Sequence, residues 1–192
     1  MNNQYDNWKN TGALKGIVNA QWSDEYKQFD WVETHVMSEV PKHDLWDNFA
    51  TKARLELEDF HRQKGVVNEA TKHYMSFSPA LPETMQSILK NENASKYHYN
   101  FLKLTSCYCI PWHYDSYSTF VRSNDVVESN AKNIKRTIVM ITPWMFGQVI
   151  QVGGQVITNW NVGDTYTWQG DVWHGAANFG FDDLVVMQIT WL

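Results

Sequence analysis

Two stretches in the second half of the chain decide its fold. Residues 108–115 read Tyr-Cys-Ile-Pro-Trp-His-Tyr-Asp, and residues 163–178 read Gly-Asp-Thr-Tyr-Thr-Trp-Gln-Gly-Asp-Val-Trp-His-Gly-Ala-Ala-Asn. Residues i and i+2 of a strand point to the same face of a sheet, so His113 and Asp115 can lie side by side. His174 must then arrive from a distant strand, which predicts a closed or sandwiched sheet.

These three residues are two imidazoles and one carboxylate, a ligand set that suits a mononuclear non-haem Fe(II) site with open coordination positions. The spacing alone is weak evidence. Seven histidines and 21 acidic residues in 192 would give about 0.8 His-x-Asp/Glu pairs by chance. The residues around the pair therefore decide the interpretation.

Length and composition set broad limits. A chain of 192 residues can form one domain, 1–192, with a real core. No apolar run is long enough for a transmembrane helix, and the polar N-terminus lacks a signal-peptide pattern, so we expect a cytoplasmic protein with no membrane partner. A net charge of −5 disfavours nucleic acid, whose phosphates need clustered Lys and Arg.

The hydrophobic pattern changes character near residue 97. Helical spacing over Leu45–Gln63 and after Pro82 predicts that residues 1–96 form a helical N-terminal support. From Tyr97 onward short strands dominate, including a hairpin over residues 149–157 around Gly153-Gly154. We therefore predict an α+β, mostly β fold, with a jelly-roll core over residues 97–192 and N-terminal helices packed against it.

The second half also resembles the Fe(II)/2-oxoglutarate-dependent dioxygenase superfamily, most closely its aspartyl/asparaginyl β-hydroxylase and prolyl 4-hydroxylase branches. The matching words are Ile110-Pro111-Trp112-His113-Tyr114-Asp115, Arg136-Thr137-Ile138-Val139-Met140-Ile141, Gly163-Asp164, His174-Gly175-Ala176-Ala177-Asn178 and Val186-Met187-Gln188-Ile189-Thr190-Trp191. The resemblance covers about residues 97–192, and the first hundred residues carry no recognised motif.

The resemblance implies a double-stranded β-helix, with His113, Asp115 and His174 as catalytic ligands of Fe(II). It implies an oxidoreductase that uses 2-oxoglutarate and O₂ to hydroxylate a C–H bond of an amino acid, a peptidyl residue or a small molecule. The protein's part in such chemistry is to orient the metal, the co-substrate and the C–H bond, and to exclude water.

One family feature is missing. In these branches a basic residue about ten positions after the distal histidine holds the remote carboxylate of 2-oxoglutarate, but no Lys or Arg follows His174. A dianion needs a cationic partner, and an arginine fork matches a carboxylate best. We expect Arg136 to take this role, with Lys103 and Tyr99 as second choices.

Other readings stay open. His113 with Asp115 could be a surface pair or a structural hydrogen bond, and His174 could merely satisfy a turn. Arg136 could simply pair with an acidic neighbour at a strand end. Trp112, Tyr114 and Tyr117 flank the metal pair, where packing is the default role and substrate contact the weaker one. The segment from Gly163 to Asn178 also resembles the second motif of cupins, so a metal enzyme without 2-oxoglutarate is one alternative. A non-catalytic jelly-roll binding protein is the other.

Overall fold

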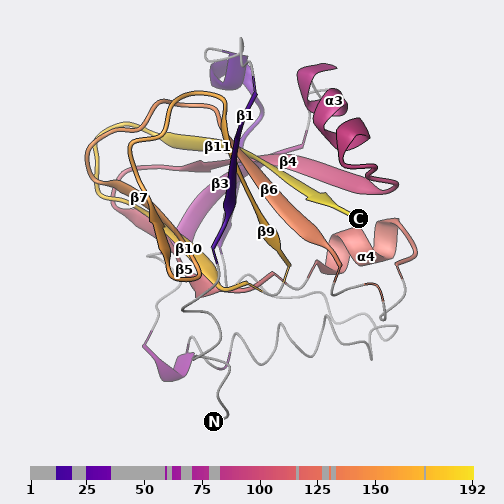
Figure 1. The fold of residues 1–192 in the computed structure, drawn as a ribbon. Helices are drawn as coiled ribbons and strands as arrows, with labels where there is room; N and C mark the ends of the chain where they lie inside the picture. The colour runs from indigo at the N-terminus through magenta and orange to yellow at the C-terminus, as the bar shows by residue number, and fades with distance from the viewer. Residues whose placement is uncertain are drawn as a thin grey trace.

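The structure is a computed structural model that describes residues 12–18, 25–35, 59, 62–65, 71–77, 83–115, 117–126, 130, 133–170 and 172–192. Figure 1 shows a chain built mainly of strands. In order, the elements are β1 (Leu14–Ile17), η2 (Glu25–Gln28), β2 (Val32–His35), β3 (Lys72–Ser76), α3 (Glu83–Asn91), β4 (Tyr97–Leu104), β5 (Tyr108–His113), α4 (Ser118–Ser123), β6 (Lys135–Met140), β7 (Gln148–Val152), β8 (Gln155–Ile157), β9 (Asp164–Gln169), β10 (His174–Asn178) and β11 (Leu184–Trp191).

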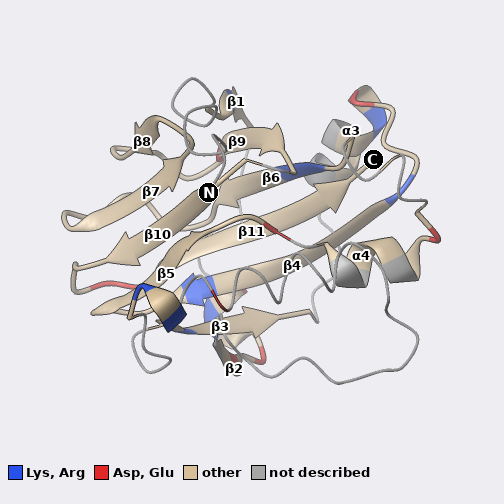
Figure 2. Ribbon diagram, turned by 90° about the horizontal axis from the view of Figure 1, so that it is seen from below, with Lys and Arg blue, Asp and Glu red and all other residues tan. Residues whose placement is uncertain are grey.

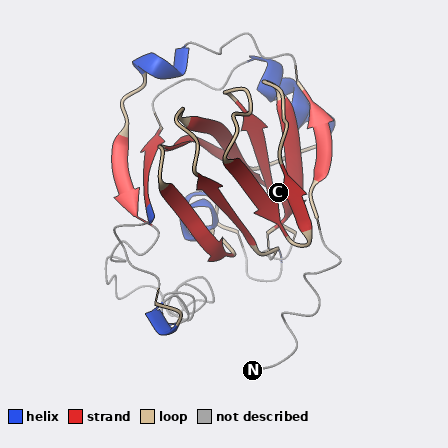
Figure 3. Cartoon of the chain, turned by 90° about the vertical axis from the view of Figure 1, so that its left-hand side faces the viewer, coloured by secondary structure: helices blue, strands red, loops and turns tan. Residues whose placement is uncertain are grey.

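The strands form two sheets. A seven-stranded sheet has the order β1-β9-β6-β11-β4-β3-β2, and a four-stranded sheet has the order β5-β10-β7-β8. All recorded pairings are antiparallel. From β4 to β11 the chain passes repeatedly between the sheets, which gives four core strands in each, as in a double-sheet jelly roll (Figure 3). The prediction of a mostly β, two-sheet core is confirmed.

The prediction for residues 1–96 needs correction. Three of their described segments, β1, β2 and β3, are strands that extend the large sheet, β1 at one edge and β3 with β2 at the other. The large sheet therefore contains strands from both sides of residue 96, the predicted boundary between a helical support and the jelly-roll core. The sequence did not reveal β1 because Leu-Lys-Gly-Ile lacks alternation and exposes Leu14 and Ile17.

The N-terminal helices are not confirmed. The predicted helix Leu45–Gln63 lies almost wholly outside the described residues. The helix expected after Pro82 is present as α3, which begins at Glu83 and buries Leu89.

The large sheet separates two apolar clusters. Leu102 and Leu104 of β4, with Ile138 and Met140 of β6, face the small sheet and join its Ile150 and Val152 in the core of the barrel. The residues between them, such as Phe101 and Val139, pack on the opposite, outer face. Burying each such side chain fully stabilises the fold by about 1.5–3 kcal/mol. This alternation determines which side chains can reach the barrel interior.

The expected hairpin at residues 149–157 is β7–β8, which turns at Gly153-Gly154. Gly153 has φ 55°, a left-handed conformation that glycine adopts without strain. Among the described residues, no helix is long and apolar enough to cross a membrane.

Candidate metal centre

His113 and His174 lie directly opposite each other on neighbouring strands of the small sheet. They are register partners of β5 and β10, and their ring centroids are 4.3 Å apart. The register shifts between His174 and Ala176, because Pro111 and Trp112 of β5 stand opposite the single residue Gly175 in a β-bulge. Proline donates no ladder hydrogen bond and suits an edge strand, which β5 is. Bulges of this kind re-aim side chains beside functional sites.

Backbone carbonyl groups orient both imidazoles. His113 Nδ1 donates to the Pro111 carbonyl at 2.8 Å, and His174 Nδ1 donates to the Val172 carbonyl at 2.9 Å. A carbonyl oxygen can only accept, so Nδ1 carries the proton in each ring. In the neutral rings Nε2 then presents its lone pair, the tautomer that binds a metal through Nε2.

Asp115 completes the cluster from just beyond the end of β5. Its Oδ1 lies 3.9 Å from His113 Nε2, and its Oδ2 lies 3.6 Å from His174 Nε2. The ligand atoms of the three residues all lie within 4.8 Å of one another. The sequence had placed Asp115 on the strand itself, whereas β5 ends at His113.

This donor set fits a divalent cation. Two Nε2 lone pairs and a carboxylate converge, and without a proton or a cation between them these groups repel each other. All three side chains are mostly buried, with exposed fractions of 15% for His113, 20% for Asp115 and 11% for His174. Two imidazoles and one carboxylate with open positions are the ligand set of non-haem Fe(II) oxygenases.

Burial keeps His174 neutral. It lowers the pKa of the imidazole below its usual value, and the Asp115 carboxylate only partly opposes this effect. A neutral imidazole is the form that binds metal, so the site is ready for an ion at neutral pH.

Arg136 contacts the carboxylate of the cluster. On β6 it shares the inner face with Ile138 and Met140. Its Nε and Nη2 both donate to Asp115 Oδ2, at 3.0 and 2.8 Å. Burial alone would raise the pKa of Asp115, but the positive charge of Arg136, with smaller contributions from the histidines, holds it well below its usual range.

Arg136 is also the last Lys or Arg in the sequence. Strands β7 to β11 accordingly carry no blue in Figure 2, whereas one end of β6 does. A cation at this site must therefore come from β6 or from earlier in the chain.

Lys103 and Tyr99, the second choices for holding a carboxylate, do not reach the cluster. Leu102 and Leu104 occupy the inner face of β4, so Lys103 and Tyr99 project from the outer face. Lys103 Nζ lies 4.7 Å from the ring centroid of Trp31, and Tyr99 packs against the outer apolar cluster. The structure corrects these two assignments.

The three aromatic residues near the metal pair differ in their surroundings. Trp112 is half-buried on β5. The ring of Tyr114 meets that of Trp173 edge-on at 5.2 Å. Tyr117 is buried, and the Arg136 guanidinium lies 5.2 Å from its ring centroid. Their contact with a substrate stays a prediction.

Sequence reasoning missed the side chains that flank Arg136 across the inner face of the large sheet. Strand register places His98, Thr190, Arg136 and Trp168 next to one another. The Trp168 ring lies 5.1 Å from the His174 ring. In the neighbouring row, Asn100 donates to Gln188 Oε1 at 3.3 Å. The sequence did contain a sign of this. Leu102 and Leu104 are buried residues of β4, and His98 and Asn100 lie on the same face because side chains alternate along a strand.

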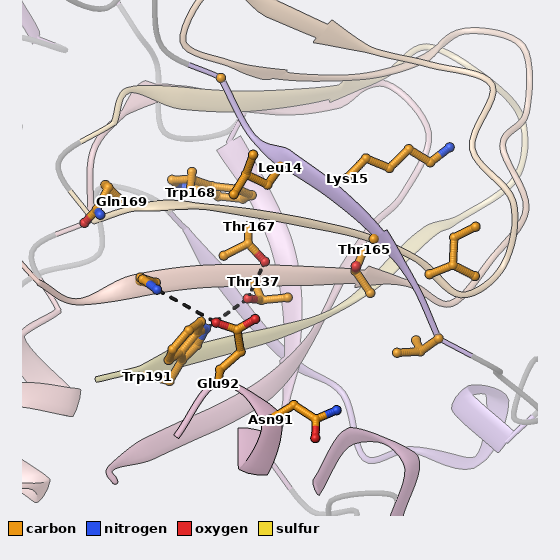
Figure 4. Close-up of a pocket in the computed structure, with 15 residues that line it drawn as sticks. Leu14, Lys15, Asn91, Glu92, Thr137, Thr165, Thr167, Trp168, Gln169 and Trp191 are labelled. Atoms are coloured by element: carbon orange, nitrogen blue, oxygen red, sulfur yellow. Dashed lines mark hydrogen bonds and ion pairs between the residues drawn. The ribbon is translucent and has the colours of Figure 1, made fainter. Parts of the chain in front are cut away.

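A separate cavity of about 520 Å³ lies on the outer face of the large sheet (Figure 4). Its floor includes Thr137 and Thr167, whose hydroxyls bond to each other at 2.8 Å, while Trp191 Nε1 donates to Thr137 at 3.0 Å. None of the three converging ligands lines it, but Trp168, whose ring lies 5.1 Å from that of His174, does. His113, Asp115 and His174 therefore lie outside this cavity.

No family model and no curated protein matches this chain. Among solved structures, a prolyl-4-hydroxylase from Pseudomonas putida is 9% identical, with a TM-score of 0.45 over 88% of this chain and 95% of that one. A predicted oxalate decarboxylase from Thermotoga maritima is 13% identical, with a TM-score of 0.41 over 63% of this chain and 81% of that one. A cupin-2 domain containing protein from Shewanella frigidimarina is 15% identical, with a TM-score of 0.33 over 50% of this chain and 70% of that one. At this level of similarity, the chain's own residues must carry any functional assignment.

Proposed function

We propose that this chain is a non-haem Fe(II)- and 2-oxoglutarate-dependent dioxygenase that hydroxylates a C–H bond of an amino acid, a peptidyl residue or a small molecule. The observation that carries the proposal is the convergence of two Nε2 lone pairs and the Asp115 carboxylate inside a jelly-roll barrel. Fe(II) held by three such ligands keeps positions for a bidentate 2-oxo acid and O₂, and supplies the oxidising chemistry.

The chain's own residues have distinct parts in this proposal. His113 and His174 bind the metal through Nε2, and the carbonyls of Pro111 and Val172 hold the two rings in place. Asp115 supplies the anionic ligand. Arg136 holds Asp115 Oδ2 and adds positive charge, which favours an anionic co-substrate.

One observation favours a second candidate, a cupin-like metal enzyme without 2-oxoglutarate. Both recorded hydrogen bonds of Arg136 go to Asp115, and Lys103 projects from the outer face of the sheet. On the described part of the inner face, Lys15 is another cation, but it lies beside Tyr166 and pairs with Asp164 at 2.8 Å, so in this candidate it does not serve the remote carboxylate of a 2-oxo diacid. In this candidate Arg136 serves the metal carboxylate alone.

Anaerobic titration with Fe(II) and 2-oxoglutarate tests the proposal. We expect Fe(II) to bind at one equivalent and 2-oxoglutarate to give a weak visible charge-transfer band. His174→Ala is the matched variant, because it removes one ligand and the band should disappear with it.

The other outcomes identify the alternatives. Tight Fe(II) binding with no response to 2-oxoglutarate contradicts the proposal in favour of the cupin-like enzyme. No metal uptake contradicts both and leaves a non-catalytic binding protein. Unchanged Fe(II) affinity in His174→Ala would show that His174 is not a ligand.

A further inference from the structure

Two buried donors beside the converging ligands have no hydrogen-bond partner in the described structure. They are the Tyr117 hydroxyl and the Trp168 indole Nε1. The residues are only 8% and 4% exposed. A buried donor without a partner costs about 1–3 kcal/mol, and native proteins keep few of them. Two such donors at one site need an explanation.

Tyr117 lies against the charged pair of the site. Its ring is 5.2 Å from the Arg136 guanidinium, and its hydroxyl is near enough to Asp115 to feel that charge. The hydroxyl also lies close to the Arg136 guanidinium, but it has the geometry of a hydrogen bond to neither group. Tyr117 also packs against Gly170, where an added Cβ would come within 2.6 Å of its ring. The ring therefore has little room to turn its hydroxyl elsewhere.

Trp168 lies on the other side of Arg136. The two residues are register partners on β9 and β6, and the Trp168 ring lies 5.1 Å from the ring of His174. Trp160 provides a contrast within the same core, because its Nε1 donates to the Thr142 carbonyl at 3.1 Å. The barrel can therefore satisfy an indole donor, and it leaves unpaired the one next to His174.

We propose that Tyr117 Oη and Trp168 Nε1 form an oxygen-binding subsite that donates hydrogen bonds to a carboxylate of the 2-oxo acid. The inference rests on the proposed function and deepens it, since it assigns the co-substrate contact to two neutral donors instead of the Arg136 fork. That fork is already bonded to Asp115.

Local charge selects an anionic ligand. Asp115 and Arg136 offset each other, and His113 and His174, whose Nδ1–H groups bond backbone carbonyls, would bind a metal as neutral ligands through Nε2. A bound divalent cation therefore leaves the site positive. A carboxylate brings the opposite charge together with the acceptor oxygens that both donors lack.

Tyr117→Phe in the full chain is the main test, because it removes the hydroxyl and keeps the ring. Calorimetry on the Co(II)-loaded protein, which avoids turnover, measures the affinity for 2-oxoglutarate and for 2-oxobutyrate, which has one carboxylate. Losing a hydrogen bond to a charged acceptor should weaken binding about ten- to a hundredfold. The thermal midpoint of the metal-free variant should stay the same or rise, because the lost hydroxyl had no partner.

Replacing Trp168 by 3-benzothienylalanine removes the N–H and keeps the shape of the side chain. We expect the same loss of affinity with no loss of metal-free stability. The matched control is the same replacement at Trp160, which breaks a satisfied bond and should lower stability without changing affinity. Tyr166→Phe, on the same inner face, controls for the loss of a tyrosine hydroxyl that has a partner, Lys15.

The two ligands locate the bound carboxylate. Weaker binding of 2-oxoglutarate alone assigns the donors to the remote carboxylate, and weaker binding of both acids assigns them to the carboxylate beside the oxo group. Either result supports the subsite. Unchanged affinities, or a lower thermal midpoint with unchanged affinity, would overturn it while the proposed function stands. If the parent binds neither acid, 2-oxo acid dependence itself fails, and the subsite with it.

Discussion

Arg136 places two donors on a single oxygen of Asp115, with Nε at 3.0 Å and Nη2 at 2.8 Å from Oδ2. The side chains are 10% and 20% exposed, and they come from β6 and from the segment after β5, in two different sheets. The pair therefore links the sheets at the candidate metal centre. It also leaves Oδ1 on the side of His113.

We predict that Arg136→Met destabilises the metal-free protein by about 3 kcal/mol, because it strands a buried carboxylate without its partner. Added Co(II) should remove much of this penalty, since the cation compensates the same charge. Chemical unfolding with and without metal measures both effects.

The double variant Arg136→Met with Asp115→Asn is the control for this substitution. Removing both charges should cost less than removing Arg136 alone. An equal penalty with and without Co(II) would contradict the coupling between the ion pair and the metal site.

We predict that Lys103→Gln leaves the affinity for 2-oxoglutarate unchanged. Lys103 lies over Trp31 and Tyr74 on the outer face, at 4.7 and 5.1 Å from their ring centroids. The substitution should cost about 0.5–1 kcal/mol of stability from the lost cation–π contacts. Calorimetry of ligand binding checks the prediction, and a large loss of affinity would show that Lys103 contributes to binding 2-oxoglutarate.

Part of the site could be predicted from the sequence, because residue type and hydrophobic periodicity are local properties of the chain. The ligand types predicted the cluster, because they depend on chemistry alone, although Asp115 lies just beyond the strand on which the i, i+2 argument had placed it. The sequence left open that Arg136 pairs with an acidic residue, but it could not identify Asp115 as the partner, because the bond joins two sheets whose packing no local pattern records. Lys103 and Tyr99 were assigned to the wrong face of β4 because polar or aromatic residues occupy the first half of both faces. Only Leu102 and Leu104 identify the inner face.

Edge strands were the least predictable part of the fold. β1 is an edge strand of four residues, and its Leu14 and Ile17 are exposed. An edge strand gains its stability from one neighbour, here β9, so its own sequence needs little amphipathic pattern. Residues Leu45–Gln63 remain a prediction, because they lie almost wholly outside the described residues.

We predict that Asn178→Ala destabilises the protein by about 2–4 kcal/mol without changing metal affinity. Its fully buried amide donates to the carbonyls of Leu104 and Asp182 at 2.8 Å each and accepts from Gly180 N at 3.1 Å. Each buried group left without its partner costs about 1–3 kcal/mol. Asn161→Ala, at an exposed position without a positive φ, is the control and should change stability little. Thermal unfolding and Co(II) titration measure the two quantities.

The last prediction concerns the stability of the metal-free protein below neutral pH. The pKa of His98 is lowered, first by burial and then by the charge of Arg136, and burial lowers the pKa of His174. Folded protein therefore binds fewer protons than unfolded protein, whose histidines titrate near 6.5. The stability contribution is present above pH 6.5 and is lost as the pH falls from there through the folded pKa values. Each histidine adds at most about 1.4 kcal/mol per pH unit, and the half-buried His98 less, because solvent screens it.

Urea unfolding between pH 5 and pH 7.5 should thus give a free energy of unfolding that rises with pH, and His98→Asn should reduce the slope. An unchanged slope in His98→Asn would mean that His98 takes up protons equally in the folded and unfolded states. Asp115, whose pKa is also lowered, acts in the same direction but below pH 4, outside this window.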